Sequence, residues 1–78
     1  MTIKVYSTPS CPWCMRAKQY LRENHVAFED IDVSSNVKAA REMVQKSGQM
    51  GVPVIDADGE IIIGFNEPRL KQIIMSSK

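Results

Sequence analysis

The stretch Cys11-Pro12-Trp13-Cys14 decides how the rest of the chain is interpreted, because it holds both cysteines of the sequence. Pro12 suits the first turn of a helix, where its missing N–H costs no hydrogen bond. With Pro12 at the first helical position, Cys11 becomes the N-cap and Cys14 the third helical residue. Both sulfurs then lie at the electropositive end of a helix, which favours a thiolate. The spacing predicts a dithiol that forms and breaks a disulfide.

The two cysteines are predicted to have different roles. Cys11 precedes the helix and is the more exposed of the pair, so we expect it to be the nucleophile. Cys14 shares a core-facing stripe with Ala17 and Leu21, so we expect it to be the resolving thiol. Trp13, between the cysteines, is expected either to stack against a substrate or to shield the disulfide.

The chain has 78 residues and a formal net charge of +1, with its charged residues interspersed. This length predicts a single domain over residues 1–78. The sequence has neither the basic stripe of a nucleic-acid protein nor an apolar run of membrane-spanning length, so we expect no partner of either kind. The first residues, Met1 to Lys4, lack the apolar segment of a signal peptide, which favours the cytoplasm. In that compartment a CxxC pair is more often catalytic or metal-binding than structural.

Apolar periodicity predicts four strands and three helices in the order βαβαββα. The predicted strands cover residues 3–6, 26–33, 52–55 and 60–63. The predicted helices begin at Pro12, after Ser34-Ser35-Asn36 and at Asn66. The first crossover is expected to be parallel, and Asp58-Gly59 predicts a hairpin. The result is an α/β fold, a four-stranded mixed sheet with helices on both faces.

The same periodicity predicts which side chains of the middle segments face the core. On the second strand these are Val26, Phe28 and Ile31. On the second helix they are Val37, Ala40 and Val44, with Met43 at the edge of the stripe.

Pro53 is the second candidate for the functional site. A proline at the first residue of a strand cannot donate a ladder hydrogen bond, and it holds the preceding Val52 extended. We expect a cis bond between Val52 and Pro53 that presents the backbone of Val52 beside the cysteines, where it can pair with a substrate strand. The alternative is that Pro53 simply begins a strand.

Three segments of the chain resemble the glutaredoxins: Tyr6-Ser-Thr-Pro-Ser-Cys-Pro-Trp-Cys14, Gly51-Val-Pro-Val-Ile55 and Ile63-Gly-Phe-Asn66. The chain is most similar to the short bacterial glutaredoxin-like proteins and to the redoxins that serve ribonucleotide reductase. The resemblance covers essentially the whole chain and implies a thioredoxin fold, a cis Pro53 and exchange at Cys11 with resolution by Cys14. The substrate contacts that we expect from it are made by Pro12, Trp13, Val52, Pro53, Gly64, Phe65 and Asn66.

The resemblance also implies partners. We expect disulfide-containing client proteins, no bound cofactor and a monomeric chain. At three positions the sequence differs from glutathione-using glutaredoxins: Thr8 stands where they often have lysine, Gly51 where they usually have threonine, and Asn66 where they often have aspartate. Because fewer charged groups remain to bind glutathione, we predict that it is a weak or optional reductant. A flavoenzyme of the thioredoxin reductase type is the other predicted electron donor.

Two alternatives assign the cysteines to metal chemistry. Copper carriers of similar length also place a CxxC after the first strand, and thiolates bind soft metals, but those carriers have the order βαββαβ. Some glutaredoxins bridge an iron–sulfur cluster between two chains, an arrangement that Pro12 and the competing Cys14 disfavour. A structural zinc site needs four ligands, which two cysteines and the remote His25 do not supply, so no metal ligand is predicted.

Overall fold

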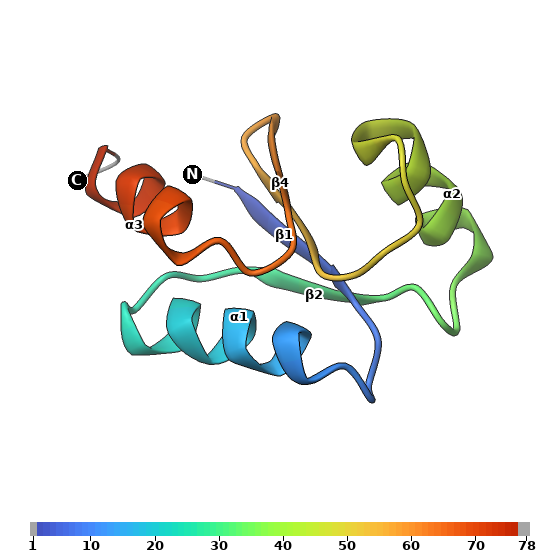
Figure 1. Ribbon diagram of the computed structural model, residues 1–78, viewed down its shortest axis with the longest axis horizontal. Coiled ribbons are helices and arrows are strands. Elements are labelled where there is room, and N and C mark those ends of the chain that lie inside the picture. The colour runs from blue at the N-terminus through green and yellow to red at the C-terminus, as the bar shows by residue number, and fades with distance from the viewer. Residues whose placement is uncertain (1, 77–78) are drawn as a thin grey trace.

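The computed structural model describes residues 2–76. Along the chain these residues form β1 (Ile3–Ser7), α1 (Pro12–Glu23), β2 (Glu29–Asp32), α2 (Val37–Ser47), β3 (Val54–Ala57), β4 (Glu60–Ile63) and α3 (Glu67–Ser76) (Figure 1). The predicted order βαβαββα is confirmed, and a helix follows β2 where the copper-carrier order requires a strand. No helix among residues 2–76 is both long and apolar enough to cross a membrane.

The sheet is mixed, with the strand order β2-β1-β3-β4. β1 runs parallel to β2 and antiparallel to β3, and β3 pairs antiparallel with β4. The β3–β4 hairpin turns at Asp58 and Gly59, whose φ angles of 51° and 95° are both positive. A two-residue turn of this kind requires positive φ angles, so the Asp-Gly prediction is confirmed.

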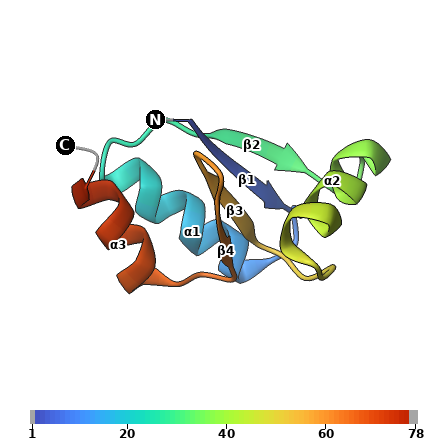
Figure 2. The same cartoon turned by 90° about the horizontal axis from the view of Figure 1, so that it is seen from above.

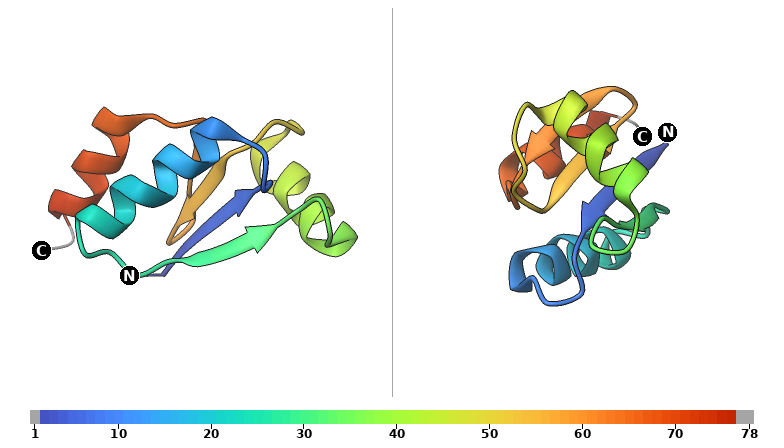
Figure 3. Two further views of the ribbon diagram at one scale, coloured as in Figure 1. Left: turned by 90° about the horizontal axis from the view of Figure 1, so that it is seen from below. Right: turned by 90° about the vertical axis from the view of Figure 1, so that its right-hand side faces the viewer.

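The two faces of the sheet carry different helices. Figures 2 and 3 show α1 and α3 on one face and α2 on the other. The larger core lies under α1 and α3 and consists of Ile3, Val5, Ala17, Leu21, Ile55, Ala57, Ile62, Leu70, Ile73 and Ile74. The smaller core lies under α2 and consists of Tyr6, Ala39, Met43 and Val54. Successive residues of a strand face opposite sides, which is why Val5 and Tyr6 belong to different cores.

Two strands start later than predicted, and β1, β2 and β3 end at residues 7, 32 and 57 rather than at 6, 33 and 55. β2 begins at Glu29 rather than at residue 26, because the backbone N–H of Val26 donates to Leu21 O (2.9 Å) and belongs to the end of α1. β3 begins at Val54 rather than at residue 52, and its pairing with β1 runs from Val54 to Ala57. Pro53 has no N–H to contribute to that ladder.

The predicted core face of α2 is wrong by about one position. Ala39 and Met43 are buried, whereas Val37 is 69% exposed, and Ala40 and Val44 are only partly covered. The side of the helix that meets Tyr6 and Val54 decides which residues are buried, and the hydrophobic pattern of so short a helix does not fix that rotation.

Candidate active site

Cys11 sits where the chain passes from β1 into α1. Its backbone is extended (φ −91°, ψ 113°), as an N-cap requires, and Pro12 occupies the first turn. The N–H of Met15 donates to Cys11 O (3.1 Å) and closes the first helical turn. The N–H of Cys14 donates to the Sγ of Cys11 (3.2 Å). The sulfur therefore takes the place of a capping oxygen, just beyond the carboxyl end of β1.

The two thiols have different surroundings. Both cysteines are free thiols; Cys14 is fully buried and Cys11 is partly exposed. Cys14 lies beside Ala17 and Leu21 on the buried stripe of α1, as predicted. An attacking group on a partner molecule can reach Cys11, whereas Cys14 can be reached only from Cys11 or after movement of the chain.

The electrostatics of Cys11 favour its thiolate. Partial burial alone would raise the pKa of Cys11, but it is outweighed by hydrogen bonds from the Cys14 thiol and from the backbone N–H groups of Cys14 and Trp13. The positive charge of Lys18 acts in the same direction. The net effect is a lowered pKa, and a thiol with a lowered pKa is a thiolate over more of the neutral pH range.

Cys14 is shifted in the opposite direction. The pKa of Cys14 is raised to about 11. Burial is the largest cause, and hydrogen bonding to Cys11 and charge repulsion from Cys11 contribute the rest of the rise. Its proton is thus held while Cys11 is a free thiolate. Two causes of the shift come from Cys11 itself, so they weaken once the Cys11 sulfur is bonded to another sulfur.

The Val52–Pro53 peptide bond is cis, as predicted. It brings the carbonyl oxygen of Val52 to 3.9 Å from the Sγ of Cys11, which donates its proton to that oxygen as a thiol. The ring of Pro53 is buried, so the group beside the sulfur is the backbone of the partly exposed Val52. In the loop before Val52, the N–H of Gly51 donates to Gln49 Oε1 (2.6 Å), and Gln49 Nε2 donates to Gly51 O (3.0 Å).

The segment Gly64–Asn66 follows β4 and contacts the cis-proline loop. Gly64 has a φ of 77° and donates its N–H to Pro53 O (2.8 Å), which ties this segment to the cis-proline loop. The ring of Phe65 packs edge-on against Tyr20, with ring centres 5.9 Å apart. Asn66 caps α3 through its Oδ1, which accepts from Arg69 N (3.2 Å). Gly64 is therefore held against the cis-proline loop, while Phe65 and Asn66 have structural partners of their own.

Pro12 and Trp13 are both exposed beside Cys11, and 56% of Trp13 is accessible. The guanidinium of Arg16 lies over the indole ring, 5.3 Å from its centre. An indole held in this way is a flat apolar surface next to the reactive sulfur, and a partner molecule can pack on it.

The sequence analysis missed one group of residues near the cysteines. Lys18 pairs with Asp30 of β2 (3.0 Å), and the buried hydroxyl of Ser7 donates to the other carboxylate oxygen of Asp30 (2.9 Å). Lys18 follows Cys14 by four residues, a spacing that places side chains on one helix face and could have drawn attention to it. Asp30 could be found only from the pairing of β1 with β2.

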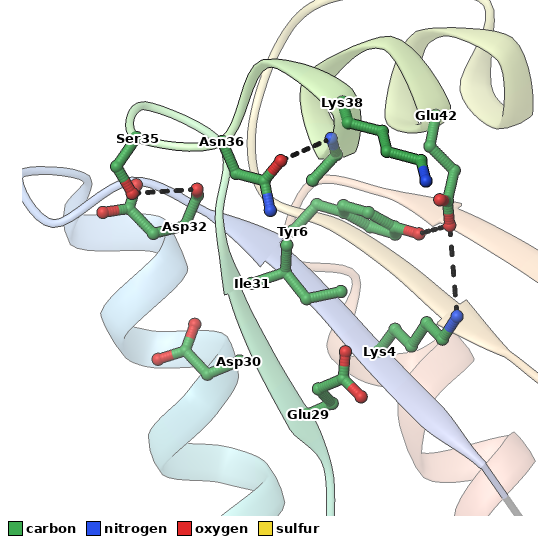
Figure 4. Close-up of a pocket in the computed structure, with 11 residues that line it drawn as sticks. Lys4, Tyr6, Glu29, Asp30, Ile31, Asp32, Ser35, Asn36, Lys38 and Glu42 are labelled. Atoms are coloured by element: carbon green, nitrogen blue, oxygen red, sulfur yellow. Dashed lines mark hydrogen bonds and ion pairs between the residues drawn. The ribbon is translucent and has the colours of Figure 1, made fainter.

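A pocket of about 410 Å³ lies elsewhere, on the α2 side of β1 and β2 (Figure 4). It is lined by Lys4, Tyr6, Glu29, Asp30, Ile31, Asp32, Ser35, Asn36, Lys38, Ala39 and Glu42. None of the predicted site residues lines it. It is therefore separate from the dithiol site, which lies at the N-terminus of α1.

A capping dithiol beside a cis-proline, on a thioredoxin fold, defines a class of proteins that exchange thiols and disulfides. The glutaredoxin family model matches residues 3–62. The chain is 47% identical over 72 residues to an uncharacterized glutaredoxin-like 8.6 kDa protein in a rubredoxin operon of Clostridium pasteurianum, covering 92% of this chain and 96% of that protein. It is 32% identical over 65 residues to glutaredoxin 3 of Escherichia coli strain K12, covering 83% and 78%.

Among solved structures, the chain is similar to the glutaredoxin-like protein NrdH-redoxin from Escherichia coli, with a TM-score of 0.84 and 25% identity over 92% of this chain and 93% of that one. The chain belongs to the glutaredoxin family. Family membership supports a thiol–disulfide oxidoreductase role in general terms.

Proposed function

We propose that this protein reduces disulfide bonds of client proteins by dithiol exchange, with Cys11 as the nucleophile and Cys14 as the resolving thiol. The observation that carries the proposal is the contrast between the two thiols. Cys11 is accessible, caps α1 and has a lowered pKa, whereas Cys14 is buried with a pKa raised to about 11.

The exchange proceeds in two steps. The Cys11 thiolate attacks one sulfur of the client disulfide, a mixed disulfide forms, and the other client sulfur leaves as a thiolate. Cys14 then loses its proton and attacks the Sγ of Cys11, which releases the second client sulfur and forms the Cys11–Cys14 disulfide. Two electrons have passed to the client, and a reductant must return two electrons to restore the dithiol.

The surroundings of Cys11 suit an extended client segment. The backbone of the partly exposed Val52 offers pairing to a client strand beside the sulfur, and Trp13 offers an apolar surface. Pro12 is exposed next to Cys11, and Gly64 is hydrogen-bonded to Pro53. The buried Pro53 acts by holding Val52 in place, and Phe65 and Asn66 act by fixing the segment that packs on it.

We propose a flavoenzyme of the thioredoxin reductase type as the main electron donor, with glutathione as a weak or optional one. Thr8 and Asn66 lack the charges that would hold glutathione, and the oxygen of Asn66 already caps α3. The Escherichia coli NrdH-redoxin, which has a thioredoxin-like activity profile, is a relative that supports this choice. We place the exchange in the cytoplasm, where clients and donors of this kind occur.

The cysteine roles are tested by trapping. Cys14→Ser should attack a disulfide client and stall as a mixed disulfide on Cys11, because no resolving thiol remains. Cys11→Ser should form no adduct and show no turnover. Mass spectrometry of both variants after incubation with the same client reads out the result. A stable adduct on Cys14 of the Cys11→Ser protein would contradict the assignment.

The donor is tested by following NADPH consumption of the oxidised protein. One arm supplies glutathione with glutathione reductase, and the other supplies a thioredoxin reductase, at matched concentrations. We expect faster turnover with the flavoenzyme alone. Each missing charged contact should weaken glutathione binding by about 1.5–3 kcal/mol, or roughly ten- to a hundredfold. Rapid, saturable turnover with glutathione at low millimolar levels, and none with the flavoenzyme, would overturn the choice of donor but not the exchange chemistry.

A further inference from the structure

A charged pair is built into the structure next to the dithiol and is not needed for the exchange steps described above. The ammonium of Lys18, on α1, lies 3.0 Å from Asp30 Oδ2 on β2. Only 14% of the Lys18 side chain is exposed, against 44% for Asp30. The charge of Lys18 is therefore held at the side of the helix and is poorly screened by solvent.

The carboxylate of Asp30 is held from two elements that also hold the cysteines. Ser7 ends β1 and precedes the loop to Cys11, and its buried hydroxyl donates to Asp30 Oδ1. Lys18 follows Cys14 by one helical turn, and its ammonium donates to Asp30 Oδ2. Figure 4 shows Asp30 leaving β2 toward α1, while Glu29 and Ile31 lie on the other face of that strand.

Other charged groups around α1 and β2 have different partners. Arg16 lies over the ring of Trp13, and Arg22 lies over the ring of Phe28. Asp32, further along β2, is bound by the N–H and hydroxyl of Ser34. The loops at residues 8–10 and 48–53 carry no charged side chain. Lys18 and Asp30 are thus the charged pair that sits between α1 and the end of β1.

We propose that Lys18 and Asp30 form an opposed pair of positioning residues that sets the reactivity of Cys11, Lys18 raising it and Asp30 limiting it. The proposal rests on Cys11 being the nucleophile. In support, the charge of Lys18 lowers the pKa of Cys11 and opposes the rise in the pKa of Cys14. A carboxylate 3.0 Å from the ammonium offsets part of that positive charge.

The proposal predicts opposite effects of two substitutions. Lys18→Met keeps the aliphatic stem and removes the charge, so alkylation of Cys11 by iodoacetamide at pH 7 should slow by about threefold. Asp30→Asn keeps an oxygen for Ser7 and removes the offsetting charge, so alkylation should become faster. The limiting rate at high pH, where Cys11 is fully a thiolate, should be unchanged in both proteins. Lys18→Arg should restore the wild-type rate.

Arg22→Met is the matched control, because it removes a positive charge from the same helix one turn farther from the cysteines, and it should leave the alkylation rate unchanged. The measurement uses the full reduced chain, with mass spectrometry to confirm modification at Cys11 and circular dichroism to confirm folding. The proposal is overturned if Lys18→Met and Asp30→Asn change the rate in the same direction, if neither changes it, or if Arg22→Met equals Lys18→Met. Alkylation needs neither client nor donor, so this result is independent of whether the protein reduces client disulfides.

Discussion

The N-termini of α1 and α2 are capped with the same geometry by side chains whose accepting atoms differ. Both helices begin after an extended N-cap residue, Cys11 (φ −91°, ψ 113°) and Asn36 (φ −131°, ψ 97°). In each, the cap side chain accepts the N–H three residues later, at 3.2 Å from Cys14 and 3.0 Å from Ala39. Neither first turn contains an acidic residue. The capping atom is a sulfur in α1 and an amide oxygen in α2.

This difference separates a reactive cap from a structural one. An amide oxygen is a strong acceptor that cannot ionise, so at Asn36 the helix N-terminus contributes only to stability. A thiol is a weak acceptor when protonated, and the same N–H groups stabilise it once it becomes a thiolate. In its thiol form, Cys11 therefore caps α1 more weakly than Asn36 caps α2, but in its thiolate form it is a nucleophile. The predictions below test this contrast.

The largest expected effect is the difference in reactivity between the two thiols. The pKa of Cys11 is lowered from its ordinary value, and that of Cys14 is raised to about 11. Against an ordinary thiol pKa of about 8.5, the thiolate of Cys14 is more than about a hundredfold scarcer at pH 7, whereas the thiolate of Cys11 is more abundant than that of an ordinary thiol. Limited iodoacetamide followed by peptide mapping should find modification on Cys11 alone. The rate should fall about tenfold per pH unit below the Cys11 pKa, since only the thiolate reacts.

Equal modification of Cys11 and Cys14 would show that the capping position does not make Cys11 the more reactive thiol. The α1 cap would then not differ from the structural α2 cap in reactivity. A second reading comes from Cys11→Ser, in which the charge and thiol of Cys11 no longer raise the pKa of Cys14. In that variant Cys14 should titrate below pH 11, while burial keeps it above an ordinary thiol. An unchanged Cys14 titration would mean that burial alone accounts for its shift.

The structural cap should affect stability without affecting exchange. Asn36→Ala removes the acceptor for the Ala39 N–H and should lower the free energy of unfolding by about 1 kcal/mol. Asn36→Ser keeps an acceptor and serves as the control, with a smaller loss. Urea unfolding of the reduced proteins measures both, and turnover with a disulfide client should match wild type. A change in turnover for Asn36→Ala would show that the α2 N-terminus contributes to the site.

The smallest expected effect concerns the capping value of the sulfur. Cys11→Ser places a hydroxyl oxygen at the position that accepts from Cys14 N and should be about 0.5–1 kcal/mol more stable than Cys11→Ala. Both variants should be inactive in exchange, so stability and activity separate at this position. Equal stabilities of the two variants in urea would mean that position 11 does not act as an N-cap.

Much of the fold was predictable because local signals agreed with the tertiary arrangement. Pro12 and Asn36 mark the starts of α1 and α2, and Asp58-Gly59 marks the hairpin. The start of β2 and the buried face of α2 were not predictable from the pattern. Val26 is bound by Leu21 at the end of α1, a local hydrogen bond that its apolar side chain does not signal. The buried face of α2 depends on a distant segment, because Ala39 packs in the same core as Tyr6.

At the site, the sequence by itself determined the chemistry: the dithiol, the order of its two sulfurs along a helix start, and the proline before β3. Those features follow from residue type and spacing, which act over one helical turn. Only the tertiary structure decided what surrounds the dithiol. It placed the Val52 carbonyl beside Cys11 and joined Asp30 to both Lys18 and Ser7. These groups come from separate strands and helices, and their approach depends on strand register and side-chain packing across the whole sheet, which short-range sequence patterns do not encode.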